Sequence, residues 1–467
     1  MSKRKAAALI LAAGKGTRMK SDRPKVLHPL AGRPMIGHVL DTVAALSPSH
    51  ALVVVGPGME EVARSVTPMP CVVQPRQLGT ADAVKTGLAS LGAFAGDVLI
   101  LYADTPLLTA ETLERMLAER AGPQAPAIVV LGFRPGGGEY GRLITGPGGV
   151  LEAIVEHRDA TPEQRAIPLC NSGVMVVDGA KLPELLAKVG NKNAKGEYYL
   201  TDIVGIARGA GLRCAYIEAG AEELLGINSR AELAQAESAL QARLRRLAME
   251  DGATLTDPAS VFFSFDTKLG RDVTVGPNVM FGPGVTVEDG AEIRAFSHLD
   301  HAHVGRRAVI GPFARLRPGA EIGTDAHVGN FVEIKNSTLG QSAKANHLSY
   351  IGDAHIGPRA NIGAGTITCN YDGYEKATTE IGAGAFIGSN TALVAPIRVG
   401  EGAIVGAGSV ITRDVEPNAL AVARAEQTNR PGWAAEFRAW KESAKRGAAS
   451  VLAKTKAKVK AQGRKKG

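Results

Sequence analysis

A glycine-rich segment near the N-terminus has the residue types that bind phosphate. Residues 11–19 read LAAGKGTRM and follow a short apolar run. The segment lacks the GxxxxGK[ST] spacing of a Walker loop, and Met19 stands where the GxGxxG pattern needs glycine. A glycine turn of this kind can direct backbone N–H groups at phosphate oxygens, while Arg18 and Lys25 neutralise their charge. The sequence predicts a nucleotide-binding loop; the alternative is a turn that serves packing alone.

Apolar runs and helical patterns alternate around this loop, from about residue 6 to residue 228. We expect buried strands at Ala7–Leu11, Ala51–Val55, Val98–Tyr102, Ala127–Leu131 and Gly173–Val177. We expect helices at Ala110–Glu119, with Thr109 as N-cap, and at Lys181–Val189. Such alternation predicts a parallel or mixed sheet covered on both faces, in a domain spanning residues 1–228.

A strong helical pattern follows this domain, from Ser229 to Met249. Ser229 and Glu232 have the spacing of a capping box. Apolar residues then recur at helical spacing, at Leu233, Ala236, Leu240, Leu244 and Leu247. We interpret residues 229–250 as the connector between two domains.

An apolar residue recurs at every sixth position beyond residue 268. The in-phase positions are Leu269, Val275, Phe281, Val287, Ile293 and Leu299, then Val304, Ile310, Leu316, Ile322, Val328 and Ile334, then Ile381, Ile387, Leu393, Val399, Val405 and Ile411. This period is typical of a hexapeptide solenoid, in which each hexad forms one face of a triangular coil. It predicts a second domain over residues 251–437. The stretches Asn336–Ile351 and Cys369–Glu380 break the phase, and insertions on solenoids usually carry function.

Composition limits the possible partners and compartments. The net charge is +8, but residues 438–467 hold eleven Lys or Arg and one Glu, which leaves the other 437 residues at −2. We therefore predict a basic, disordered tail at 438–467, no nucleic-acid partner and no stable membrane insertion. Four scattered cysteines predict no disulfide framework and fit a reducing, cytoplasmic location. The apolar run after Lys5 leads into the glycine loop, so we interpret it as a strand rather than a signal peptide.

Seven segments of the N-terminal half resemble the sugar-nucleotide pyrophosphorylases. They are LAAGKGTRM with RPKVLHPLAGRPMI, QPRQLGTA at 74–81, YADTPL at 102–107, YGR at 140–142, IVEH at 154–157, NSG at 171–173 and GIN at 226–228. The resemblance implies that a sugar phosphate attacks the α-phosphorus of UTP and expels pyrophosphate, which is largely positioning and charge neutralisation. It implies Arg18 and Lys25 as catalytic residues. It also implies Asp104 and Asn228 as oxygen ligands of Mg²⁺.

The same resemblance implies the substrate-binding positions of this uridylyl site. They are Leu11, Ala12, Ala13, Gly14, Lys25, Gln74, Gly79, Thr80, Tyr102, Gly141, Glu156, Asn171 and Asn228. Glu156 and Asn171 would bind the sugar. A lone aspartate after a strand is more often a helix cap than a metal ligand. The matched segments around Asp104 favour the metal. Ala103 departs from the glycine frequent in the family.

Two segments of the C-terminal half, KANHLSY at 344–350 and NIGAGTITCNYDG at 361–373, resemble an acetyltransferase. Taken with the N-terminal segments, they resemble the family of bacterial bifunctional UDP-N-acetylglucosamine pyrophosphorylases and glucosamine-1-phosphate N-acetyltransferases. The resemblance implies His347 as the base that makes the substrate amine nucleophilic, a task suited to the pKa of histidine. A lone histidine is usually structural, and we read His301, His303 and His355 that way.

The family resemblance also implies the ligand residues of the acetyl site. Arg317 and Lys335 would bind the sugar phosphate, and Tyr350 and Asn361 the sugar. The positions implied for acetyl-CoA are Ala364, Asn370, Tyr371, Ser389, Ala407 and Arg424. A backbone N–H near Ala364 would stabilise the oxyanion. Asn346 stands where the family often has glycine.

The resemblance implies an α/β fold, with a Rossmann-like nucleotidyltransferase domain followed by a left-handed parallel β-helix, assembled as a homotrimer. It implies that the β-helix acetylates glucosamine-1-phosphate from acetyl-CoA. The first domain then transfers UMP from UTP to N-acetylglucosamine-1-phosphate, which supplies peptidoglycan and lipopolysaccharide precursors. The alternative is a nucleotidyltransferase whose solenoid only assembles or regulates it. A scaffold with relic motifs would require loss of Arg18, Lys25, Asp104 or Asn228, and all four are present.

Overall fold

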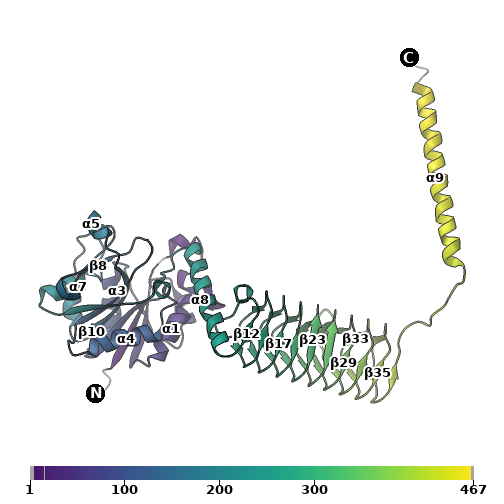
Figure 1. The fold of residues 1–467 in the computed structure, drawn as a ribbon, viewed down its shortest axis with the longest axis horizontal. Helices are drawn as coiled ribbons and strands as arrows, with labels where there is room; N and C mark the ends of the chain where they lie inside the picture. Colours follow the sequence, from purple (N-terminus) through teal and green to yellow (C-terminus); the bar gives the residue numbers. More distant parts are fainter. Residues whose placement is uncertain (1–4, 15, 464–467) are drawn as a thin grey trace.

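Two bodies of different construction are joined by one helix. The computed structural model describes residues 5–14 and 16–463, so Lys15 of the predicted phosphate loop lies outside the described residues. An α/β domain at the N-terminus is followed by a long prism of short strands, and a single helix extends beyond the far end of the prism (Figure 1).

The first domain is built on a nine-stranded mixed sheet. Its main path runs β11 (Cys214–Glu218), β7 (Ile128–Phe133), β10 (Cys170–Asp178), β6 (Asp97–Tyr102), β1 (Ala6–Leu11), β4 (His50–Val55) and β5 (Cys71–Val73), with β8 (Arg142–Thr145) and β9 (Leu151–Val155) attached beside β10. Strand β10 is antiparallel to β6 and β7, whereas β1 is parallel to both of its neighbours. The five strands expected from the sequence are confirmed, with ends that differ by a few residues.

Both faces of this sheet are covered, because successive side chains of a strand point to opposite sides. Leu9 belongs to one apolar cluster, with residues of α3, α6 and α7, and Ile10 belongs to another, with residues of α1 and α4. The helices of the domain are α1 (Met35–Ala45), α2 (Glu60–Ser65), α3 (Thr80–Leu91), α4 (Ala110–Ala121), α5 (Pro162–Arg165), α6 (Leu182–Ala187) and α7 (Asp202–Gly209). The expected cap of α4 is present, since the Thr109 hydroxyl accepts a hydrogen bond from the Thr112 N–H.

Helix α8 (Arg230–Glu250) connects the two bodies, as the sequence predicted. Its residue Leu240 shares an apolar cluster with Leu30 and Leu107 of the first domain, and Phe265 of the prism packs against that cluster. The Gln241 side chain exchanges two hydrogen bonds with the backbone of Phe263, at 2.7 and 2.8 Å. The connector is therefore packed against both bodies.

The prism is a left-handed parallel β-helix with three faces, as predicted. Face 1 contains β12 (Thr254–Leu255), β14 (Thr274–Val275), β17 (Glu292–Ile293), β20 (Val309–Ile310), β23 (His327–Asn330), β26 (Lys344–His347), β29 (Asn361–Ile362), β32 (Phe386–Ile387), β35 (Ile404–Val405) and β37 (Leu420–Ala421). Face 2 contains β13 (Lys268–Leu269), β16 (Thr286–Val287), β19 (Ala302–Val304), β22 (Ala320–Ile322), β25 (Ser337–Leu339), β28 (Ala354–Ile356), β31 (Thr379–Ile381) and β34 (Ile397–Val399). Face 3 contains β15 (Met280–Phe281), β18 (His298–Leu299), β21 (Arg315–Leu316), β24 (Glu333–Lys335), β27 (Tyr350–Gly352), β30 (Ile367–Cys369), β33 (Ala392–Val394) and β36 (Val410–Ile411).

The six-residue period fills the interior of the prism. Every predicted in-phase residue from Val275 onwards is buried in one continuous core, and Leu269 is partly buried against it. The phase breaks over Asn336–Ile351 as predicted, but the coil is not interrupted, because β25, β26 and β27 continue the three faces. Ile334 and Leu339, both buried, stand five residues apart, and this shortened hexad shifts the phase without interrupting the coil.

The second predicted break is a true insertion. Strand β30 ends at Cys369 and β31 begins at Thr379, and an isolated bridge joins Tyr371 to Lys376 within the loop between them. The Tyr374 side chain at its tip is 94% exposed. This loop follows face 3, the face that also holds Arg317, Lys335 and Tyr350.

The C-terminal segment differs from the expected disordered tail, since α9 (Trp433–Gly463) is one continuous helix. The prediction of disorder there is wrong over the described residues because the segment is rich in Ala, Lys and Arg, which have high helix propensity. Trp433 and Phe437 stack on its surface with ring centroids 5.0 Å apart. Across the part of the chain that the structure describes, no helix has the length and apolar content needed to span a membrane.

Two candidate active sites

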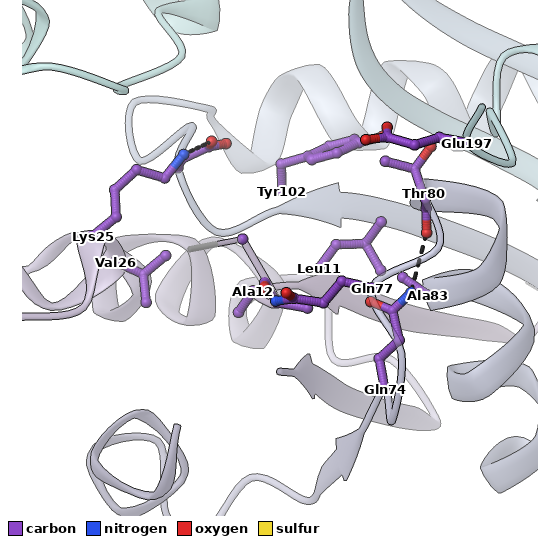
Figure 2. Close-up of a pocket in the computed structure, with 14 residues that line it drawn as sticks. Leu11, Ala12, Lys25, Val26, Gln74, Gln77, Thr80, Ala83, Tyr102 and Glu197 are labelled. Carbon is purple, nitrogen blue, oxygen red and sulfur yellow. Dashed lines mark hydrogen bonds and ion pairs between the residues drawn. The ribbon is translucent and has the colours of Figure 1, made fainter. Parts of the chain in front are cut away.

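The first site is a cleft of about 460 Å³ beside the carboxyl ends of β1 and β6. Ligands bind at such strand ends in doubly wound sheets because the loops there diverge. The cleft is lined by Leu11, Ala12, Ala13, Gly14, Lys25, Val26, Gln74, Gln77, Gly79, Thr80, Ala83, Tyr102, Asp104 and Glu197. Ten of these residues were predicted from the sequence. Figure 2 shows Lys25 on one side of the cleft and Gln74 and Thr80 on the other, with Tyr102 between them.

A second cleft of about 540 Å³ adjoins the first. Its lining includes the predicted residues Arg18, Glu156 and Asn228. The two clefts meet at Lys25, because this residue lines the first and its Nζ contacts Asn228 Oδ1 of the second at 3.0 Å. The arrangement can hold a nucleotide and a second phosphorylated molecule end to end.

The predicted residues Gly141 and Asn171 line neither of these two clefts. Asn171 is buried, and its backbone N–H donates to the Gly141 carbonyl at 2.8 Å. The Asn171 Oδ1 accepts from the Gly173 N–H at 3.0 Å. Gly141 adjoins Glu156, since a Cβ built at Gly141 would lie 3.5 Å from Glu156 Oε2.

Lys25, Asp104 and Asn228 form a polar cluster at the junction of the clefts. Lys25 Nζ lies 2.5 Å from Asp104 Oδ2, and the Lys25 side chain is only 9% exposed. Gly16 allows this approach, since its φ is +62° and a Cβ built there would lie 2.5 Å from the Lys25 Cβ. The Asp104 and Asn228 oxygens contact the same nitrogen and therefore face a common point. A carboxylate and an amide oxygen are ligands that fit Mg²⁺, which commonly takes one or two carboxylates together with substrate phosphates.

The first turn of α8 holds Asn228 in place. Glu232 Oε2 accepts hydrogen bonds from the Asn228 N–H at 2.7 Å and from the Ser229 hydroxyl at 3.1 Å. Ser229 caps the helix as predicted, by accepting from the Glu232 N–H at 3.3 Å. The predicted capping box is therefore wrong in one detail, because the Glu232 carboxylate bonds to Asn228 and not to the N-cap N–H. The spacing of Ser229 and Glu232 in the sequence predicted a helix cap. Nothing in the sequence indicated that Glu232 contacts Asn228, a predicted metal ligand.

Arg230 of helix α8 contacts the loop that carries Arg18. Arg18 is exposed, and its neighbour Met19 accepts a hydrogen bond from Arg230 Nε at 3.4 Å. Arg230 Nη1 also lies 3.2 Å from His28 Nδ1. Burial first, and then Arg230, lower the pKa of His28, which keeps its ring neutral. Because Arg18 is exposed, its guanidinium is accessible to a phosphate.

Burial also shapes the groups beside the cleft. Burial raises the pKa of Glu156, and the Thr201 hydroxyl, which donates to Glu156 Oε1 at 3.1 Å, partly opposes this rise. Burial raises the pKa of Tyr102, and the negative charges of Glu156 and Asp104 add to this effect. The Tyr102 side chain is therefore an uncharged part of the lining of the first cleft, and the Glu156 carboxyl is suited to hydrogen bonds with sugar hydroxyl groups.

Gln77 was not predicted as a site residue, although it stands within the matched segment QPRQLGTA. Its Nε2 donates to the Ala13 carbonyl, which ties this segment to the phosphate loop. Gln74 Nε2 instead donates to Asp82 Oδ2 at 2.7 Å and to the Gly79 carbonyl at 3.2 Å. The two glutamines thus fix the far side of the first cleft.

The second site lies at one corner of the β-helix. His347 ends β26 on face 1, and its Nδ1 lies 2.6 Å from Asn330 Oδ1, on the neighbouring strand β23. Asn346 has ordinary extended backbone within β26, so its departure from glycine leaves the strand intact. The histidines that were read as structural have other partners: His301 pairs with Asp300, His303 with Glu288 and Glu321, and His355 with Thr338.

Face 3 carries the predicted phosphate ligands on adjacent coils. Arg317 Nη1 donates to Glu333 Oε1 at 2.8 Å, and this bond raises the pKa of Arg317. Lys335 pairs with Gly352 on the next coil, beside Tyr350. Glu333 was not predicted as a site residue, although it lies on the same face and pairs with Arg317, a predicted phosphate-binding residue.

A buried aspartate anchors the far edge of this face. Asp353 accepts hydrogen bonds from Asn336 Nδ2 at 2.6 Å and from the side chain of Asn370. Burial tends to raise the pKa of Asp353, but the amide donors and the charges of Lys335 and Lys376 outweigh it, so the net shift is downward. Asp353 was also missed, because its partners stand 17 residues away on neighbouring coils.

The predicted acetyl-CoA residues continue along the corner of His347. Ala364, Ser389 and Ala407 stand at this corner on successive coils, where Asn390 N–H donates to Ala364 O and Gly408 N–H to Ser389 O. Arg424 Nη1 donates to the Ala407 carbonyl at 3.0 Å. Tyr371 belongs to the inserted loop and is 60% exposed.

The comparisons with known proteins agree with this geometry. Residues 8–175 match the MobA-like NTP transferase domain, and residues 266–301, 301–336 and 378–413 match the bacterial transferase hexapeptide (six repeats). Bifunctional protein GlmU of Paramagnetospirillum magneticum is 62% identical over 440 residues, which cover 94% of this chain and 98% of that protein. Bifunctional protein GlmU of Rhodospirillum rubrum is 65% identical over 436 residues, covering 93% and 98%. This chain belongs to the GlmU family.

Membership of the GlmU family confirms the predicted family and the order of the two domains. A third GlmU relative, from Azorhizobium caulinodans, is 55% identical over 444 residues, again across both domains. The match to both families in one chain is what distinguishes a GlmU protein from a nucleotidyltransferase alone. The roles of individual residues stay predictions that the geometry of the two sites supports.

Proposed function

We propose that this chain makes UDP-N-acetylglucosamine in two steps, acetylation of glucosamine-1-phosphate in the β-helix and uridylyl transfer in the α/β domain. The observation that supports it most is that one chain contains both a polar cluster of predicted residues at the clefts and a predicted base on the β-helix. Lys25, Asp104 and Asn228 meet at the junction of two clefts, and His347 has one ring nitrogen engaged by Asn330.

In uridylyl transfer, an oxygen of N-acetylglucosamine-1-phosphate attacks the α-phosphorus of UTP and pyrophosphate leaves. Backbone N–H groups near Gly14 face the nucleotide phosphates, and Arg18 and Lys25 neutralise their charge. Asp104 and Asn228 would hold Mg²⁺, which supplies further positive charge at the phosphates. Glu156, at the second cleft, bonds the sugar hydroxyl groups.

In acetyl transfer, the amine of glucosamine-1-phosphate attacks the thioester carbonyl of acetyl-CoA. His347 takes a proton from the amine, and coenzyme A leaves as the thiol after the tetrahedral intermediate collapses. Arg317 and Lys335 carry the charges that bind the sugar phosphate. Within the described part of the chain the Ala364 N–H has no hydrogen-bond acceptor, and it is suited to the oxyanion.

We also propose that the acetyl site is completed in a homotrimer. Asn361 lies on face 1 whereas Arg317 and Tyr350 lie on face 3, so one copy presents its sugar ligands on two different faces. The corner between these faces carries an exposed apolar ladder, made of Phe296, Phe313, Phe331 and Leu348. Exposed apolar surface of this kind marks an interface. A second copy that covers it would bring sugar-binding residues of face 1 and of face 3 together from two copies.

The cytoplasmic location stays a prediction, supported by the free state of Cys71, Cys170, Cys214 and Cys369. All four thiols are unpaired although two of them are buried. An unpaired set of this kind is typical of proteins from a reducing compartment.

The test of the proposed function mixes the purified protein with glucosamine-1-phosphate, acetyl-CoA, UTP and Mg²⁺, and follows free thiol and pyrophosphate together. Release of both, with pyrophosphate dependent on acetyl-CoA, is the expected result. Pyrophosphate that appears only when N-acetylglucosamine-1-phosphate is supplied, with no thiol released, would instead indicate a nucleotidyltransferase on a structural solenoid.

A further inference from the structure

We propose that Asn330 is a positioning residue for acetyl transfer, which fixes the tautomer of His347 by accepting its Nδ1 hydrogen. The inference rests on the proposed acetyltransferase function and adds a residue to it. Asn330 Oδ1 lies 2.6 Å from His347 Nδ1, and the two residues are direct partners on strands β23 and β26.

The chemistry of the pair determines which ring nitrogen is free. A carboxamide oxygen only accepts hydrogen bonds, so the Nδ1 that faces it carries the hydrogen. A neutral imidazole has one hydrogen, and Nε2 is then the nitrogen with the lone pair. Nε2 takes the proton of the substrate amine while Nδ1 keeps its own, and the resulting imidazolium still donates to Asn330.

The fold brings Asn330 and His347 together in three ways. The two coils approach closely, because a Cβ built at Gly329 would lie 2.0 Å from the Asn346 carbonyl oxygen. The Leu348 N–H donates to the Asn330 carbonyl at 3.0 Å, which fixes the register on the far side of the histidine. From the next coil, the Gly365 N–H donates to the His347 carbonyl at 3.3 Å. His347 is therefore held between two coils and its ring is oriented by a third contact.

A second pair in the same domain shows what a structural histidine has instead. Thr338 Oγ1 lies 3.1 Å from His355 Nδ1, with the same separation of 17 residues and on the other side of the prism, at face 2. A hydroxyl both donates and accepts, so it accommodates either tautomer of the ring. The Thr338→Val variant thus removes a matched contact and leaves the acetyl site untouched.

The experiment compares N330A, N330D and T338V with the unaltered full-length protein. Thiol release is measured across pH at several concentrations of glucosamine-1-phosphate. Uridylyl transfer to supplied N-acetylglucosamine-1-phosphate is measured in parallel as a test of folding. We expect N330A to lower the kcat of acetyl transfer by about 10- to 100-fold, with KM nearly unchanged, by analogy with the loss of partners that orient metal-bound histidines. T338V and all uridylyl activities should match the unaltered protein.

The aspartate variant makes the test specific. N330D keeps an acceptor for the Nδ1 hydrogen, so we expect it to restore most of the kcat lost in N330A. Its negative charge favours the imidazolium and moves the acidic limb of the pH profile to higher pH. An N330A protein with unaltered kcat, or an N330D protein as slow as N330A with an unmoved pH profile, would overturn the proposal. Absence of thiol release from the unaltered protein would instead contradict the acetyltransferase function itself.

Discussion

The Glu232 carboxylate accepts a hydrogen bond of 2.7 Å from the backbone N–H of Asn228, and this bond ties the connector helix to the uridylyl site. Asn228 in turn presents its Oδ1 to Lys25. The first turn of α8 therefore has two roles. It begins the helix that links the domains, and it holds the polar cluster at the junction of the clefts.

Replacing Glu232 by Ala should weaken uridylyl transfer through Asn228. We expect the Mg²⁺ concentration for half-maximal activity to rise by about tenfold, as is usual when a residue that orients a metal ligand is lost. E232Q, which keeps an oxygen acceptor, should retain most of the activity. The measurement is a Mg²⁺ titration of pyrophosphate release. E250A is the matched control, since Glu250 is at the other end of the same helix and pairs only with Arg246 among the described residues. Equal Mg²⁺ dependence in E232A and E250A would contradict this role.

The pH dependence of stability should report on Glu156. Burial raises its pKa above the ordinary 4.5. A carboxyl whose pKa is higher in the folded state than in the unfolded chain binds its proton more tightly when folded. Stability is therefore lost as pH rises from 4.5 through the raised value. E156Q cannot ionise and should flatten the fall of the thermal midpoint over this window, while it raises KM for N-acetylglucosamine-1-phosphate. The measurement is the thermal midpoint of the unaltered protein and of E156Q from acid to neutral pH. If the two midpoints fall in parallel with pH, Glu156 does not ionise in this window.

Loss of His347 should separate the two activities. H347A is expected to lower acetyl transfer by roughly 10²- to 10⁴-fold, the usual contribution of a general base, and to leave uridylyl transfer unchanged. Independence is expected because the matched residues of the two sites lie in separate bodies joined by α8. H355A is the control, since His355 is an exposed histidine on face 2. A folded H347A protein without uridylyl activity would show that the sites are coupled.

The phenylalanine ladder should control assembly. The rings of Phe296 and Phe313 are stacked 4.9 Å apart, those of Phe313 and Phe331 are 5.2 Å apart, and all three side chains are about half exposed. F313D places a charge in the middle of this ladder, so we expect the protein to become monomeric, with acetyl transfer reduced by at least tenfold and uridylyl transfer retained. The mass in solution, measured by light scattering, tests the first expectation. F262D is the control, because Phe262 is 44% exposed but lies under the Arg245 guanidinium near the connector. A trimeric F313D protein would place the interface elsewhere.

The chain of amino acids by itself determined the architecture and most of the site. Every predicted in-phase residue from Val275 onwards is buried, because a six-residue apolar period can be satisfied by a triangular coil and by neither a helix nor an ordinary strand. Ten of the residues that line the first cleft could be predicted, since the segments that resemble the pyrophosphorylases are continuous in sequence. His347 could be singled out for the same reason.

Only the tertiary structure showed the partners that hold these residues. Asn330, Asp353 and Glu232 contact site residues through pairings that no motif contains. In the β-helix the reason is register: β14 pairs with β17 at a separation of 18 residues, but β23 pairs with β26 at 17. The shortened hexad between Ile334 and Leu339 therefore determines that Asn330 is the residue paired with His347. That choice depends on how a whole coil packs on the next one, and the spacing of apolar residues along the chain leaves it open.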